Sequence, residues 1–200
     1  MNKQDVSIVE EQWLHQSFLR LKRYHLSYRL FSGELSKTVS REVVIRPRVA
    51  AVLPYDPVLD HVVLIEQFRI GAITDSVSPW LMEIVAGVAE GEESLETLAR
   101  QETSEESGLE VLELLPIYEY WVSPGFCDER VALFCGRVDA SKAGGIHGLA
   151  GEGEDIRVST LPAERAFAAV VSGKINNSAS MLALLWLQVN HAQLRKQWGA

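Results

Sequence analysis

A run of carboxylate residues between two glycines is the part of this sequence that indicates a chemical function most clearly. Residues 87–109 read GVAEGEESLETLARQETSEESGL and contain Glu102, Glu105 and Glu106. On an α-helix, side chains three and four positions apart share one face, so these carboxylates form one acidic patch. Two unit charges ~4 Å apart repel by about 4 kcal/mol at an effective dielectric near 20. The patch therefore suits a hard divalent cation, and Mg²⁺ is the usual choice where phosphates are also bound.

A run of charged residues is usually part of an ordinary acidic helix that faces solvent. The spacing of the residues in and around this patch distinguishes it from such a helix. It follows the Nudix box, G-x5-E-x7-R-E-U-x-E-E-x-G-U, in which U is aliphatic. The matching residues are Gly87, Glu93, Glu102, Glu105, Glu106, Gly108 and Leu109. The chain departs from the motif at Gln101, where the motif has Arg, and at Thr103, where it has an aliphatic residue. The chain thus resembles the Nudix hydrolases, which cleave nucleoside diphosphates linked to another moiety.

Further segments narrow this resemblance to one group of Nudix enzymes. From about residue 15 to the C-terminus the chain looks like the ADP-ribose pyrophosphatases, which hydrolyse ADP-ribose to AMP and ribose 5-phosphate. The likeness is carried by residues 80–87 (WLMEIVAG), 123–125 (SPG), 145–148 (GIHG) and 176–177 (NN). The resemblance implies an α/β fold, the Nudix α/β/α sandwich around a mixed sheet.

The resemblance also implies a Mg²⁺ site, with Mn²⁺ as a substitute, and a catalytic base. By matching position, the metal ligands are Ala86 through its backbone carbonyl, Glu102, Glu106 and Glu154. Glu105 is a second-tier candidate. The base is Glu152, in the glycine-rich segment 144–155, because a flexible loop can close over a substrate and bring a carboxylate to the reacting water. The alternative is that the acidic residues of this loop are only solubilising surface charges.

The remaining implied site residues contact the substrate. Four charged residues match phosphate and ribose contacts, for which Arg offers two parallel hydrogen bonds: Arg41, Glu42, Arg46 and Arg69. A substrate-facing loop is matched by Ser123, Pro124, Gly125 and Glu129. Phe18 and Leu19 match positions on the adenine side, contributed across a dimer. An Arg in a strand is more often an edge charge, and an aromatic residue in a strand is more often core.

Gln101 changes one expected contact. In the family, the Arg at this position is credited with an ion pair to the Glu at the position of Glu93. Gln can donate a hydrogen bond there but carries no charge. Arg100 is next in sequence but points about 100° away on a helix. Because the metal ligands are intact, we expect a modified enzyme rather than an inactive one.

The pattern of apolar residues predicts two parts. Alternation over residues 19–30, with a parity change between Leu21 and Tyr24 that suggests a bulge, and a second run at 43–45 predict a small antiparallel β unit over residues 1–45. Such a unit is too thin to be stable alone, so we expect it to pack on the main domain, on a second subunit or on both, and we predict a homodimer through this unit. Residues 46–200 would form the Nudix domain, with strands near 49–53, 61–68, 80–85, 111–121, 131–138 and 156–159. Helices are expected at 94–108, 162–171 and 178–196.

Composition limits the partners. A net charge of −8 over 200 residues argues against a nucleic-acid surface or an anionic membrane. Cys127 and Cys135 lack metal-ligand spacing and are expected to be reduced thiols. The polar N-terminal segment is unlike a signal peptide, and no apolar run reaches membrane-spanning length, so a cytoplasmic protein is expected.

Three functions remain open from sequence. The first is a Mg²⁺-dependent pyrophosphatase for ADP-ribose or a related ADP-sugar. The second keeps the chemistry but takes another nucleoside diphosphate sugar, such as GDP-mannose, because the base-contacting residues are weakly marked. The third is a non-catalytic module that senses a nucleotide, which Gln101 suggests and the retained Glu102, Glu106 and Glu152 oppose.

Overall fold

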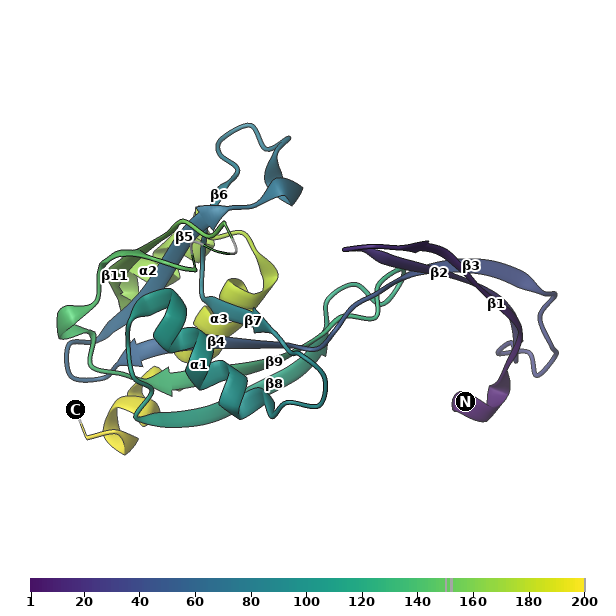
Figure 1. Ribbon diagram of the computed structural model, residues 1–200. Coiled ribbons are helices and arrows are strands. Elements are labelled where there is room, and N and C mark those ends of the chain that lie inside the picture. Colours follow the sequence, from purple (N-terminus) through teal and green to yellow (C-terminus); the bar gives the residue numbers. More distant parts are fainter. Residues whose placement is uncertain (150, 152, 200) are drawn as a thin grey trace. The chain divides into compact units, whose positions relative to one another are not determined.

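The computed structural model describes every residue except Ala150, Glu152 and Ala200, and the chain forms two compact units (Figure 1). The first unit comprises Met1–Pro47 and Trp121–Arg130, and the second comprises Arg48–Tyr120 and Val131–Ala200. The first boundary lies close to the division expected between residues 45 and 46. The segment Trp121–Arg130, which the sequence division left with the Nudix domain, belongs to the first unit because its backbone pairs with the end of a strand there. Val44 donates to the Phe126 carbonyl at 2.8 Å and accepts from the Asp128 amide at 3.1 Å.

The first unit is a three-stranded antiparallel sheet in the order β1-β2-β3. Its strands are β1 (Val6–Gln16), β2 (Arg20–Tyr28) and β3 (Val39–Ile45), and the short 3-10 turn η1 (Lys3–Asp5) precedes them. Strand β1 was not predicted, because polar residues interrupt the alternation of its apolar residues. The register shifts between Trp13 and His15, opposite Lys22 and Leu21, close to the expected bulge.

This unit has almost no interior of its own. Ser27 is its only buried residue, and all residues of the unit are described. Val9, Phe31 and Leu35 expose 67%, 98% and 64% of their surface. A lone sheet that leaves large apolar side chains in water is not expected to be stable by itself. The first unit therefore needs another protein surface to cover it.

The second unit contains a mixed eight-stranded sheet. The order of its main path is β10-β11-β5-β4-β9-β8, with β6 paired to β5 and β7 paired to β4. The strands are β4 (Val49–Asp56), β5 (His61–Phe68), β6 (Trp80–Glu83), β7 (Val85–Val88), β8 (Glu113–Trp121), β9 (Arg130–Arg137), β10 (Gly145–His147) and β11 (Ile156–Pro162). Strands β4 and β9 are parallel, and the other registered pairs are antiparallel. Two 3-10 turns, η2 (Ile70–Ala72) and η3 (Ala140–Lys142), lie in its connections.

Helices cover both faces of this sheet (Figure 1). They are α1 (Leu95–Ser107), α2 (Ala163–Val171) and α3 (Ser178–Gln197). Alternate residues of β4 divide between two cores, since successive strand residues point to opposite faces. Ala51, Leu53 and Tyr55 pack with α2 and α3, whereas Ala50 and Val52 pack with α1. The expected α/β sandwich with a mixed sheet is confirmed.

The helix ends follow the expected residues with one difference. Gly108 ends α1 in the left-handed conformation, at φ 69°. Ser94 occupies the N-cap position of α1, but its side chain makes no capping hydrogen bond. Asn177 caps α3 instead, accepting from the Ser180 amide at 3.2 Å. Among the described helices, none is both long enough and apolar enough to cross a membrane.

Candidate functional site

Glu106 is the central carboxylate of the second unit. It lies on the inner face of α1, and only 3% of its surface is exposed. Its Oε2 atom accepts a hydrogen bond from the backbone amide of Ala86 at 3.1 Å. Ala86 belongs to β7, which pairs with β4 in the middle of the sheet. This hydrogen bond therefore holds the Glu106 side chain of α1 against strand β7.

The first position of the acidic motif is a glycine, Gly87, because the Glu102 side chain packs against the backbone there. A Cβ atom built on Gly87 would lie 1.9 Å from Oε1 and 2.0 Å from Cδ of Glu102. Only glycine lets β7 approach the Glu102 carboxylate this closely. The spacing from Gly87 to Glu102 thus reflects packing between a strand and a helix, and it keeps Glu102 next to Ala86.

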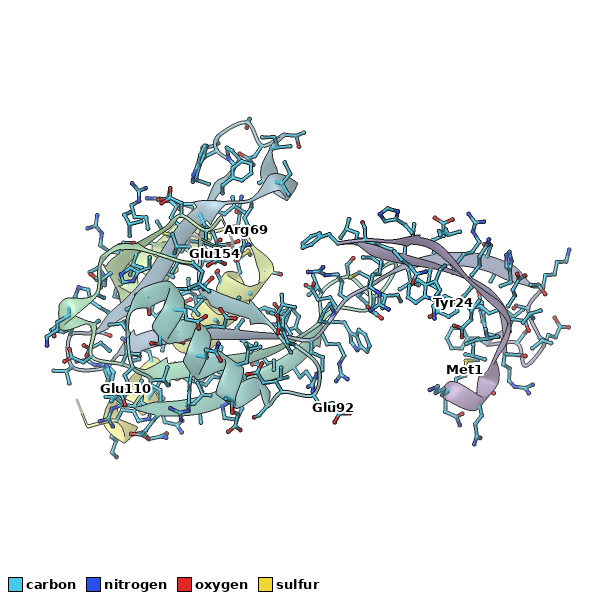
Figure 2. All side chains as sticks on the ribbon, in the orientation of Figure 1. Met1, Tyr24, Arg69, Glu92, Glu110 and Glu154 are labelled. Carbon is cyan, nitrogen blue, oxygen red and sulfur yellow. The ribbon has the colours of Figure 1, made fainter. Side chains whose placement is uncertain are left out.

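Burial and neighbouring charges act together on Glu106. Burial, the largest influence, raises the pKa of Glu106 to about 8; the Ala86 hydrogen bond opposes it, and the negative charges of Glu102 and Glu154 add to it. Arg69 lowers the same pKa. The charges of Glu102, Glu154 and Arg69 therefore all act on the Glu106 carboxyl. Figure 2 labels Arg69 and Glu154, which lie near the end of β5 that leads to η2.

The segment that carries Glu154 is held against the end of α1. The Glu154 carboxylate accepts from the Leu149 amide at 3.1 Å. A Cβ atom on Gly108 would lie 2.7 Å from the His147 ring, and His147 Nε2 lies 2.9 Å from the Gly144 carbonyl oxygen. Gly108 is therefore required twice, by its positive φ and by the packing of His147. Glu152, the expected base, lies outside the described residues.

Arg69 is positioned by a partner that the sequence analysis did not single out. Its Nε atom donates to Oε2 of Glu83 on β6 at 2.8 Å. Burial raises the pKa of Glu83, and the charge of Arg69 opposes this shift. Glu83 lies inside the segment 80–87 that carried the family resemblance, but spacing alone does not reveal that it contacts Arg69.

The expected substrate contacts of the first unit form a small group around Arg46. Arg46 donates to Glu129 Oε2 at 3.3 Å through Nε and to Asp128 Oδ1 at 2.7 Å through its backbone amide. Its guanidinium carbon lies 5.7 Å from the centre of the Phe18 ring, within the range of a cation–π contact. Phe18 is 87% exposed and Leu19 is 50% exposed, so neither is core.

Other residues of the first unit that were expected to contact the substrate have different hydrogen-bond partners. Glu42 pairs with Arg23 at 2.6 Å, and Arg41 donates to the carbonyl of Ser40. Ser123, Pro124 and Gly125 form a turn in which the Ser123 carbonyl accepts from the Phe126 and Cys127 amides. These residues belong to the first unit, whereas the carboxylates belong to the second.

The two departures from the motif have local explanations. Thr103 is fully buried at the aliphatic position, and its hydroxyl donates to the Ala99 carbonyl at 2.7 Å. The helix backbone thereby satisfies the extra polar atom. Gln101 donates to Glu105 Oε1 at 3.0 Å, and Arg100 donates to the Val111 carbonyl at 2.5 Å. Arg100 therefore does not replace the missing arginine, as expected.

The carboxylates fit a hard cation by their chemistry. Within the described part of the chain, no three His, Cys, Asp or Glu side chains are arranged around one point as metal ligands. However, Glu106 is buried beside two further negative charges, and its hydrogen bond to Ala86 leaves the second carboxylate oxygen available. A divalent cation bound by Glu102 and Glu106 would offset this repulsion and the loss of hydration.

The buried charge leads to a stability prediction for the cation-free protein. The pKa of Glu106 in the folded protein exceeds its ordinary value of 4.5, so folding disfavours the ionised form. This penalty is absent below pH 4.5 and grows as pH rises towards 8. In chelator at pH 7, Glu106→Gln should raise the free energy of unfolding by on the order of 1–3 kcal/mol, since the amide still accepts from Ala86.

Urea unfolding of both proteins at pH 4 and pH 7 measures this difference. Glu110→Gln is the control, because Glu110 is exposed just beyond α1 and should change neither value. Equal stability of wild type and Glu106→Gln at pH 7 would contradict the assigned burial cost.

The chain is similar to known proteins over most of its length. The NUDIX domain model matches residues 45–179. The ADP-ribose pyrophosphatase of Escherichia coli K12 is 47% identical over 98% of this chain and 94% of its own length. The GDP-mannose pyrophosphatase of Salmonella typhimurium LT2 is 31% identical over 94% of this chain and 97% of its own. A crystal structure of an ADP compounds hydrolase superposes with a TM-score of 0.72 at 17% identity, covering 98% of this chain and 99% of that one, which supports the fold alone.

Taken with the buried Glu106 on Ala86, the Gly87–Glu102 packing and the motif spacing, these matches establish that the chain belongs to the Nudix family.

Proposed function

We propose that this protein hydrolyses the pyrophosphate bond of ADP-ribose, or of a related ADP-sugar, to AMP and ribose 5-phosphate. The observation that carries the proposal is the buried Glu106 carboxyl, which is bound to the Ala86 amide beside the Gly87–Glu102 contact and on which the charges of Glu102, Glu154 and Arg69 act. An array of acidic ligands with one cation beside it is suited to a metal-bound pyrophosphate. The name and high coverage of the E. coli relative support ADP-ribose as the substrate.

In this proposal the ligands of Mg²⁺ or Mn²⁺ are the carboxylates of Glu102, Glu106 and Glu154 and the Ala86 carbonyl. The bound cation supplies charge neutralisation and a more acidic water. Arg69 binds a phosphate oxygen, and Glu83 holds its guanidinium in place. Glu152 removes a proton from the attacking water. Arg41, Glu42, Arg46, Phe18, Leu19 and the loop residues Ser123, Pro124, Gly125 and Glu129 bind the nucleotide end.

We also propose that the protein is a cytoplasmic homodimer. The first unit exposes Val9, Phe31 and Leu35 and has no core of its own. A second copy of the same unit would cover this surface symmetrically. Cys127 and Cys135 are free thiols, in agreement with a reducing compartment.

A second candidate substrate is GDP-mannose, because a relative at 31% identity bears that name. The carboxylate chemistry would be the same, so only the base and the sugar distinguish the two. A non-catalytic sensor is less favoured, since the residues placed as ligands are all present.

The function predicts release of AMP from ADP-ribose with Mg²⁺ and none with EDTA, measured by anion-exchange chromatography. ADP-glucose and GDP-mannose, assayed in parallel, rank the substrates by kcat/KM. Glu152→Gln should lower kcat by ~10²–10⁴-fold while ADP-ribose still binds, as expected for loss of a general base. Binding without turnover by wild type would support the sensor, and faster turnover of GDP-mannose would support the second candidate.

The packing of Gly87 leads to a further prediction. Gly87→Ala places a methyl group in the space of the Glu102 carboxylate, so kcat/KM should fall by at least about tenfold while the sheet remains folded. If displacement of Glu102 is the cause, adding Gly87→Ala to Glu102→Ala should lower kcat/KM by less than about twofold more. Equal losses in both backgrounds would show that Gly87 acts in another way.

The dimer predicts a mass of twice 22.3 kDa in sedimentation equilibrium. The double variant Phe31→Asp, Leu35→Asp should sediment near 22.3 kDa, because charge on both exposed side chains opposes burial between copies. Val171→Asp is the matched control, since Val171 is 82% exposed on the second unit. Monomeric wild type, or an unchanged mass for the double variant, would refute this interface.

A further inference from the structure

A cavity of about 620 Å³ opens beside Arg69 in the second unit. Its lining includes Arg69, Thr74, Ser76, Leu81 and Asn176, together with Asn177. These residues come from the end of β5, the connection to β6, β6 itself and the segment before α3. Neither the motif nor the site described above uses any of them except Arg69.

The cavity adjoins the carboxylate cluster through Arg69. This side chain lines the cavity, pairs with Glu83 and acts electrostatically on Glu106. In the β5–β6 register, Leu81 lies opposite Gln67 and Glu83 lies opposite Ile65, so Leu81 and Glu83 face the same side of the sheet. A phosphate bound at Arg69 would therefore lie next to the cavity.

The lining favours an uncharged, hydroxyl-rich group. Thr74 and Ser76 offer hydroxyls, and Asn176 offers an exposed amide. Asp75, also at the cavity, accepts from the Val77 and Ser78 amides through Oδ1 and stabilises its own loop. Among the described lining residues, Arg69 is the one cation and none is aromatic, so a second phosphate or a stacked base finds no partner there.

Gln67 supplies a second observation. It is 8% exposed, and among the described residues its Nε2 atom has no hydrogen-bond partner. Buried amides are nearly always paired in folded proteins. Gln67 lies directly opposite Leu81, a residue of the cavity wall. A hydroxyl group or a water molecule held there would satisfy its free donor.

We propose that this cavity receives the sugar attached to the second phosphate, at the opposite end of the substrate from the nucleoside. Thr74 and Asn176 contact its hydroxyls. The Nε2 atom of Gln67, opposite Leu81, donates to a hydroxyl group or to a water molecule held beside them. Asn177 has a structural part, since its side chain already bonds to Met82 and Ser180. The inference rests on the proposed pyrophosphatase function.

The test compares two substrates that differ only in the sugar, ADP-ribose and the β-methyl ester of ADP. Both yield AMP, and only the first has a group to fill the cavity. Thr74→Val and Asn176→Ala should each lower kcat/KM for ADP-ribose by about 2- to 10-fold, the usual effect of one lost hydrogen bond. For the methyl ester, kcat/KM should stay unchanged. Gln67→Met should show the same selective loss.

Matched controls are Thr160→Val and Gln193→Ala, whose side chains are exposed elsewhere on the second unit and should affect neither substrate. An equal loss with both substrates, or no loss with either, would overturn the sugar assignment while leaving the pyrophosphatase function intact. Absence of AMP release by wild type from both substrates would overturn the function itself, and the sugar site with it.

Discussion

The second unit is organised around one buried carboxyl. Glu106 is held by the Ala86 amide in a position where burial opposes its charge and two other carboxylates add repulsion. Such an arrangement lowers stability in the absence of a counter-charge. A bound divalent cation would bring the missing positive charge at the junction of α1 and β7.

Several other features of the molecule follow from this requirement. Gly87 is a glycine so that Glu102 can lie against β7, and Gly108 lets His147 pack over the end of α1. That packing holds the segment with Glu154 near Glu106. Glu83 pairs with Arg69, whose charge also acts on Glu106. Each of these contacts belongs to the second unit.

The sequence was most informative where geometry repeats. The helical spacing of Glu102 and Glu106 and the left-handed end at Gly108 both follow local rules. It was least informative where contacts join distant segments. Strand β1 has mixed polarity because little of it is buried, and Glu83 and Gln67 acquire their significance only when β5 and β6 pair. The capping of α3 by Asn177 was likewise not predicted. Conversely, Ser94 was predicted to cap α1, but its side chain makes no capping hydrogen bond.

The most direct test of this account is the binding of Mn²⁺ without substrate, followed by electron paramagnetic resonance of the free ion. Wild type should bind Mn²⁺ saturably, and Glu106→Gln should weaken the affinity by more than about tenfold, because the amide cannot replace a charged ligand. Glu110→Gln should bind as wild type does. Equal affinity in wild type and Glu106→Gln would contradict the claim that the buried carboxyl is there to hold a cation.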